Sequence, residues 1–226
     1  MSIFESKPRF REINTWQDEL RLGSKRAVLQ RGDILFIGGE NVTDITGVFG
    51  TAVTLVTNSP YYHMAIYDHA GRFVHAGWPK VESRDLRIFY LKKSNGILTW
   101  GRPRHRDGRP VTEEEASKVI AFAEEQIGRP YDIMANLSFL FRVDGLPEVP
   151  PFVRKMFQDR NWLEDNKKWH CSELVGASWF KAAGVIFVED MDSKSYLSPA
   201  DIYDSLYQDV VCTLKLRDGR FKLLTK

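Results

Sequence analysis

The sequence WHCSELVGASWF, residues 169–180, joins a polar start to a long apolar run. This pattern predicts a buried helix that carries Cys171 in its first turn and ends at Gly184 as the C-cap. The N-terminus of a helix has partial positive charge and unpaired N–H groups, which favour a thiolate over a thiol. The segment therefore predicts a core helix with a candidate nucleophile at its start.

Two strands joined by a turn are predicted upstream, between residues 62 and 76. Residues 62–67 and 72–76 have strand patterns, and residues 68–71 between them have a hairpin-turn sequence. Each strand carries one histidine, His63 in the first and His75 in the second. A histidine on such a strand is a candidate for the base that a cysteine nucleophile requires.

The length of this turn decides whether the two histidines meet. If the turn is a three-residue loop with Gly71 in the left-handed conformation, His63 falls opposite Gly77. His75 then lies on the same face, roughly 7–8 Å away on the diagonal, where two imidazoles can meet. A two-residue turn would shift the register by one residue and move His75 to the other face. A Cys-His-His triad therefore requires the three-residue loop.

Further strands and helices are predicted along the rest of the chain. The strands are expected at residues 32–37, 86–90, 96–100 and 210–216, and the helices at 14–29, 112–127, 132–142 and from Ser198 onward. The helix at 112–127 has the clearest signals, because Thr112 and Glu115 form a capping box and Ile127 closes an apolar face. A block of strands with helices before and after it predicts an α+β fold.

The domain organisation follows from the absence of repeats and of low-complexity linkers. We expect residues 1–30 to form an N-terminal helix or arm and residues 31–226 to form a single domain. The Pro-rich stretch that begins at Asp144 cannot hold regular structure, so we expect an insertion at residues 144–168.

The bulk composition limits the classes of function. With 32 basic and 30 acidic side chains the net charge is +2, so no nucleic-acid partner is expected. The basic run at residues 102–109 is interpreted as a solvated loop. No segment approaches the ~18 apolar residues of a membrane helix, and the N-terminus lacks the apolar stretch of a signal peptide. A cytoplasmic protein with free thiols and no transmembrane segment is expected.

The other cysteine and histidines are assigned structural or surface positions. Cys212 lies in an apolar strand and is expected in the core. His170 is adjacent to Cys171, and because neighbouring helix positions do not face each other, we expect it at the surface. His69 and His105 are expected to be solvated. The sequence lacks Cys-x-x-Cys and His-x-x-x-His spacings, so no metal site and no cofactor are expected.

These residues predict a triad with defined roles. Cys171 is the nucleophile, His63 takes the thiol proton and later protonates the leaving group, and His75 orients the His63 ring. The Cys171 backbone N–H at the helix start is a natural oxyanion donor, and Tyr62 is a weak candidate for the second donor. Because a neutral third member stabilises imidazolium less than a carboxylate does, three carboxylates remain alternatives: Asp68, Glu82 and Glu173.

Six short motifs in a fixed order carry a resemblance to a known family. They are GDIL (32–35), HMAIY (63–67), FVHA (73–76), GRPYD (128–132), CSELV (171–175) and SPAD (198–201). Together they resemble the circularly permuted branch of the NlpC-type papain-like cysteine hydrolases, and the likeness covers residues 31–216. In this branch the cysteine follows the histidine, as it does in lecithin:retinol acyltransferase-like enzymes and in bacterial and poxviral relatives.

The resemblance implies a permuted papain-like core, in which a small antiparallel sheet packs on a central helix that carries the cysteine. It assigns Cys171 as the nucleophile, His63 as the base and position 75 as the third polar member. Many bacterial relatives carry a carboxylate at this third position, whereas the acyltransferase-like enzymes carry histidine. His75 fits the second pattern, which leaves the substrate open.

Three functions are compatible with these features. The leading hypothesis is a cysteine hydrolase, amidase- or peptidase-like, that cleaves an amide bond of a small peptide through an acyl-cysteine intermediate. The first alternative is a lipid-directed acyltransferase or thioesterase, which requires an apolar cleft; candidate lining residues are Phe139, Leu140, Phe141, Phe152 and Phe157. The second alternative is a catalytically silent binding module that retains the fold.

Overall fold

The computed structural model describes residues 10–12, 29–39, 53–54, 57–86, 95–132, 167–188, 197–205, 207–217 and 220–224. In chain order the elements are β1 (Phe10–Glu12), β2 (Ile34–Gly38), β3 (Tyr61–Tyr67), β4 (Arg72–Ala76), β5 (Val81–Asp85), β6 (Asn95–Pro103), α4 (Glu113–Glu125), α7 (Cys171–Ala183), α8 (Pro199–Tyr203), β7 (Gln208–Arg217) and β8 (Arg220–Leu224). The described strands form one sheet in the order β1-β8-β7-β6-β2-β3-β4-β5, and every pairing is antiparallel. The predicted α+β class is therefore confirmed.

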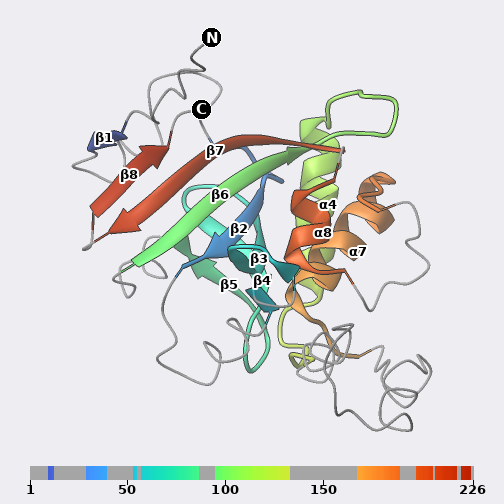
Figure 1. Cartoon of the computed structure of the whole chain (residues 1–226). Coiled ribbons are helices and arrows are strands. Elements are labelled where there is room, and N and C mark those ends of the chain that lie inside the picture. The colour runs from blue at the N-terminus through green and yellow to red at the C-terminus, as the bar shows by residue number, and fades with distance from the viewer. Residues whose placement is uncertain are drawn as a thin grey trace, which may run out of the picture.

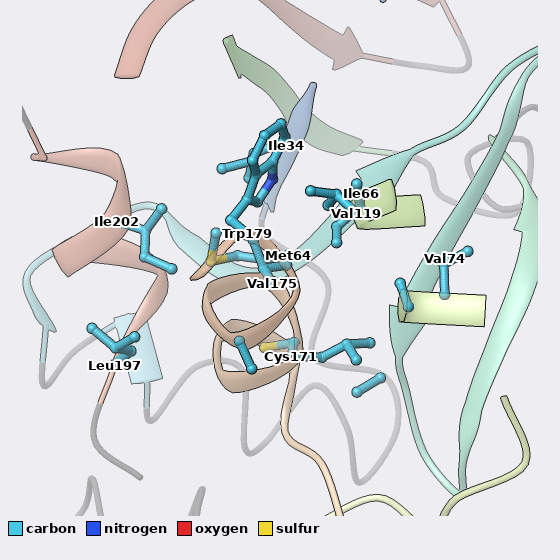
Figure 2. Packing of buried hydrophobic residues seen from close by; sticks show 14 of the residues in the cluster. Ile34, Met64, Ile66, Val74, Val119, Cys171, Val175, Trp179, Leu197 and Ile202 are labelled. Atoms are coloured by element: carbon cyan, nitrogen blue, oxygen red, sulfur yellow. The ribbon is translucent and has the colours of Figure 1, made fainter. Parts of the chain in front are cut away.

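The three helices α4, α7 and α8 gather on one side of the sheet (Figure 1). Their apolar side chains and those of one sheet face form what we term the helix-side cluster, which includes Met64, Ile66, Cys171, Val175 and Trp179. Figure 2 shows side chains of α7 among those of β2, β3 and β4. Within the described residues, no helix has both the length and the apolar character needed to cross a membrane.

The opposite face of the sheet carries a second apolar group, which we term the outer cluster. It contains Leu29, Leu35, Ile37, Ala65, Tyr67, Phe73, Leu86, Leu98, Trp100, Cys212 and Leu214. Strand alternation explains the division, since successive side chains of a strand point to opposite faces. Met64 and Ile66 thus face the helices, whereas Ala65 and Tyr67 face away from them. The predicted core position of Cys212 is confirmed.

The β3–β4 hairpin has the register that the sequence predicts for a three-residue loop. Ile66 pairs with Val74 and Tyr67 with Phe73. The turn is closed by the Asp68 N–H, which donates to the carbonyl of Arg72 over 2.9 Å. Gly71 has a φ of +84°, in the left-handed region that glycine adopts without steric cost. This register places His63 and His75 on one face of the sheet.

Local capping signals fix the helices. α4 begins with the predicted capping box, in which the Thr112 side chain and Glu115 exchange hydrogen bonds. The Ser198 side chain accepts from the N–H of Asp201 at the start of α8. Gly184 ends α7 with a φ of +66°. The prediction that Ile127 belongs to the apolar face of this helix is wrong. α4 ends at Glu125, and Ile127 lies beyond it with 46% of its surface exposed.

Other sequence expectations are corrected or lie outside the described residues. β5 was not predicted, because VESRD has a single strongly apolar residue, and neither were β1 and β8. Of the predicted strand at 86–90, only Leu86 is among the described residues, and it is buried next to the end of β5. Residues 14–28, 133–142 and 144–166 lie outside the described residues, and with them the five candidate lipid-contacting side chains.

Candidate active site

The thiol of Cys171 is buried at the N-terminus of α7, where only 4% of the residue is exposed. Burial raises the pKa of this thiol, while backbone N–H groups of Met64, Ser172 and Cys171 itself act in the opposite direction. The helix start therefore does supply N–H donors, as the sequence predicts. Without a partner that takes the proton, however, desolvation keeps the sulfur in its thiol form.

The contact between the Cys171 sulfur and the Met64 N–H locates the thiol relative to the sheet. The Tyr67 N–H donates to the carbonyl of Asp33, towards β2. Because successive N–H groups of a strand point to opposite edges, the Met64 N–H points towards β4. Within residues 61–77, however, β3 and β4 pair only next to the turn, and the pair farthest from the turn is Ile66 with Val74. The two strands part beyond that pair, and the Met64 N–H acts on the sulfur of Cys171, which belongs to the helix-side cluster.

A β-bulge lies directly beside His63. Ile37 of β2 pairs with His63, but the next residue, Gly38, pairs with Tyr61, so Tyr62 is the extra residue. Bulges of this kind bend a strand and re-aim its side chains, and they recur next to active sites. Tyr62 packs against the outer cluster, on the face away from α7. Its placement gives no support to a role as the second oxyanion donor.

His63 and His75 contact each other directly. The Nε2 atom of His63 is 2.8 Å from Nδ1 of His75, and the two rings are nearly perpendicular at an angle of 85°. His63 lies opposite Ile37, and the His75 ring packs on Phe73. Paired residues of neighbouring strands share a face, so both histidines stand on the outer face. The meeting of imidazoles that the register predicts is confirmed.

Glu82 stands behind this histidine pair. It lies directly opposite His75 in the β4–β5 ladder, and its Oε1 atom is 3.5 Å from Nε2 of His75. The Arg84 guanidinium contacts the same oxygen at 2.6 Å. The His75 imidazole, followed by Arg84, holds the pKa of Glu82 below its usual value. At 3.5 Å the Glu82–His75 contact is an ion-pair distance and long for a hydrogen bond.

The other two carboxylates considered from the sequence lie elsewhere. Asp68 contacts Arg31 at 3.1 Å and the neighbouring imidazole of His69, in the β3–β4 turn. Glu173 is 3.9 Å from His170. Of the three alternatives, Glu82 is thus the carboxylate found beside the histidine pair in the β4–β5 ladder.

The predicted surface position of His170 is wrong. His170 is fully buried and is the N-cap of α7, where its Nδ1 atom accepts from the N–H of Glu173. Burial lowers its pKa to about 4, so the ring is neutral at physiological pH and Nδ1 can act as an acceptor. The sequence argument failed because it placed His170 inside the helix, whereas the cap precedes the helix.

The basic run at 102–109 is paired more extensively than a solvated loop. Arg102 forms two 2.9 Å hydrogen bonds with the buried carboxylate of Asp33. His105 lies between Arg109 and Glu115, with 12% of its side chain exposed. The expectation that His105 is solvated is therefore wrong, whereas His69 does lie largely exposed at the hairpin turn.

A polar cavity of about 710 Å³ lies at the far end of α7 from the thiol. Its lining includes Trp179, Arg31, Asp33, Asp68 and the start of α4. Its lining includes neither Cys171 nor the histidine pair, and its basic and acidic side chains pair with one another. This cavity is separate from the cysteine–histidine site.

The chain matches no protein-family profile, and it has no significant match among curated proteins. Among the described residues, no group of three His, Cys, Asp or Glu side chains is arranged to hold a metal ion.

Proposed function

We propose that this chain is a cysteine hydrolase that cleaves an amide bond through an acyl-cysteine intermediate, with Cys171, His63 and His75 as its triad. One observation carries the proposal. The imidazole of His63 is held by His75 over 2.8 Å on the same strand whose Met64 N–H contacts the Cys171 sulfur. The proposal joins this histidine pair on the outer face to Cys171, which starts α7 on the helix side, as base, orienting group and nucleophile.

Each member of the triad has a defined step. His63 is engaged by His75 through Nε2, so Nδ1 is the atom that takes the Cys171 proton. The thiolate attacks the amide carbonyl, and the Cys171 N–H stabilises the resulting oxyanion. The tetrahedral intermediate collapses, the C–N bond breaks, and His63 protonates the departing amine. Water, deprotonated by His63, then hydrolyses the thioester and regenerates the thiol.

The buried position of the thiol is consistent with this scheme. A lone thiolate is costly in a desolvated site, but a thiolate paired with an imidazolium is stabilised by its partner. Because burial raises the pKa of Cys171, the proposal requires His63 to supply the charge that stabilises the thiolate. A cysteine with a merely structural role would show no such dependence on His63.

The resemblance to permuted papain-like hydrolases supports the same assignment. The antiparallel sheet, the buried helix that begins at the cysteine, and the histidines on adjacent strands all agree with the permuted papain-like core that we propose for this chain. A small peptide is the substrate that we propose.

The experiment that tests this proposal is a pH titration of the thiolate by its ultraviolet absorbance, which does not require reagent access to the buried sulfur. The protein used is Cys212→Ser, in which Cys171 is the single thiol. We expect the thiolate to appear well below the ordinary thiol pKa of ~8.5. His63→Ala should move the titration to higher pH by removing the partner charge.

A matched control is present in the chain. Cys171→Ser leaves Cys212, which is similarly buried and whose pKa burial raises to about 12, so no thiolate should appear near neutral pH. If Cys171 instead titrates at or above the ordinary value with and without His63, the pair does not form, and a silent binding module becomes the better description. Where the pair forms, incubation with activated peptide amides and intact-mass analysis should reveal an acyl adduct on Cys171.

A further inference from the structure

We propose that Glu82 is a positioning residue that acts through His75 and selects the tautomer in which His63 can accept a proton. The inference rests on the proposed function, because it concerns the base of the same site. It identifies a fourth member behind a triad whose third member, a histidine, carries no charge of its own.

The placement of Glu82 is set by the sheet. β4 and β5 pair from Arg72 and Asp85 to Ala76 and Val81, and this register puts Glu82 directly opposite His75. Arg84 contacts the same carboxylate oxygen at 2.6 Å. His75 is buried, and Phe73 packs on its ring. The line from His63 through His75 to Glu82 is therefore built from rigid strand positions.

The contact between the two histidines allows two proton arrangements. In the first, the His63 Nε2–H donates to Nδ1 of His75, and the His75 proton is on Nε2. In the second, the His75 Nδ1–H donates to Nε2 of His63, and Nε2 of His75 is a lone pair. Both arrangements satisfy the 2.8 Å hydrogen bond equally well.

The carboxylate distinguishes between these arrangements. In the first, an N–H of His75 faces the Glu82 oxygen at 3.5 Å, which is attractive. In the second, a lone pair faces a negative charge, which is repulsive. Glu82 therefore favours the first arrangement, and in that arrangement the His63 Nδ1 carries the lone pair that a base needs. In the second arrangement Nδ1 is already protonated and cannot take a proton from Cys171.

The charge of Glu82 has a second consequence. When His63 becomes an imidazolium, the nearby negative charge stabilises it, and so stabilises the thiolate–imidazolium pair. The titratable and charged groups in contact with this line include His63 from β3 and Arg84 from β5. The His75 ring stands between Glu82 and His63, and Arg84 and partial solvent exposure weaken the effect further, so we expect a shift of at most about one pKa unit.

The test uses two readouts on the full chain in the Cys212→Ser background. The first is the ultraviolet thiolate titration of Cys171. The second is the ¹⁵N chemical shift of the imidazole nitrogens, which reports the tautomers of His63 and His75. Glu82→Gln keeps the shape of the side chain but removes the charge, and its amide can donate or accept, so it selects neither tautomer.

Glu115→Gln is the matched control. Glu115 is also a glutamate paired with an arginine and a histidine, Arg109 and His105, but it belongs to α4 and not to the site. We expect Glu82→Gln to raise the thiolate pKa of Cys171 by at most about one unit, which is at most about tenfold less thiolate at a given pH below it. It should also mix the two tautomers. Glu115→Gln should change neither readout.

Each outcome decides between the two proposals. If Glu82→Gln titrates like the parent protein and keeps its tautomers, Glu82 has no positioning role, although the cysteine–histidine pair stands. If the parent protein shows no His63-dependent thiolate, the proposed function fails, and the ¹⁵N shifts still test the tautomers. A His75 proton on Nδ1 in the parent protein overturns the inference without any variant. Should Glu82→Gln fail to fold, Glu82→Asp retains the charge and should keep the first tautomer.

Discussion

Gly77→Ala is the substitution that tests the histidine pair most directly. A Cβ atom at position 77 would lie 2.5 Å from Cε1 and 2.9 Å from Nδ1 of His75. Carbon atoms in contact are separated by about 3.5 Å or more, so the imidazole has to move by roughly 1 Å. His75 is buried against Phe73 and cannot swing into open space. The displaced atom, Nδ1, is the one that contacts His63.

The expected effect on stability is small compared with the effect on the site. Overpacking costs about 1–3 kcal/mol. The backbone of Gly77 is outside the positive-φ region, so alanine also reduces the entropy of the unfolded chain, which offsets about 0.4–1 kcal/mol. The protein should therefore remain folded, with a free energy of unfolding lower by about 1 kcal/mol. A displacement of about 1 Å in a catalytic group, by contrast, can reduce turnover about 100-fold.

The assay combines thermal unfolding with the thiolate titration of Cys171, and the matched control is a double-mutant cycle. If Gly77→Ala acts by moving the imidazole of His75, it should raise the Cys171 pKa in the parent protein but have no further effect in a His75→Ala background. An unchanged titration in Gly77→Ala, or an equal shift in both backgrounds, would show that the position of the His75 ring does not govern the site.

Two further predictions concern the groups that support the fold. Burial lowers the pKa of His170 from 6.5 to about 4, so neutral His170 should contribute about 3 kcal/mol to the free energy of unfolding, fully present above pH 6.5 and lost as the pH falls towards 4. His170→Asn keeps a cap acceptor and should flatten this pH dependence in denaturant titrations; an unaltered dependence of the unfolding free energy on pH would contradict it. Arg102→Leu leaves the Asp33 carboxylate buried without its partner and should lower the free energy of unfolding by about 3 kcal/mol, whereas Arg104→Leu breaks an exposed pair with Asp209 and should lower it by less than about 1 kcal/mol. Equal losses of stability in thermal unfolding would show that burial of the ion pair does not decide its contribution.

The sequence predicts those parts of the fold that local signals specify. Residues 61–76 contain their own turn, in which both Ala70 (φ +49°) and Gly71 (φ +84°) are left-handed, and this local turn sets the register that brings the histidines together. α7 is likewise predicted by its apolar run and by Gly184. In both cases the determining interactions are close in sequence, so a pattern of a few residues contains the information.

The features that the sequence does not predict depend on longer-range pairing or on unusual residues. The role of Glu82 depends on the β4–β5 register, and β5 is too polar to be recognised as a strand. His170 caps α7 although histidine is not among the preferred N-cap residues. Burial keeps its imidazole neutral, and the hydroxyl of Ser172 lies 3.3 Å from its Nδ1 atom. These are tertiary contacts, and no local pattern reports them.

The two faces of the sheet place a requirement on the proposed chemistry. Alternation puts His63 on the outer face and Met64 on the face that α7 covers, so a continuous sheet would separate His63 from Cys171. The proposed proton transfer therefore requires the thiol and the imidazole to meet across the edge of β3, where β3 and β4 part beyond Ile66 and Val74.

The same divergence decides what the Met64 N–H does. If the β3–β4 ladder continued in its register, Met64 would lie opposite Ala76, and its N–H would be used by the sheet. In the structure it contacts the Cys171 sulfur, where it favours the thiolate. Pairing of the two strands and stabilisation of the thiolate therefore compete for one donor.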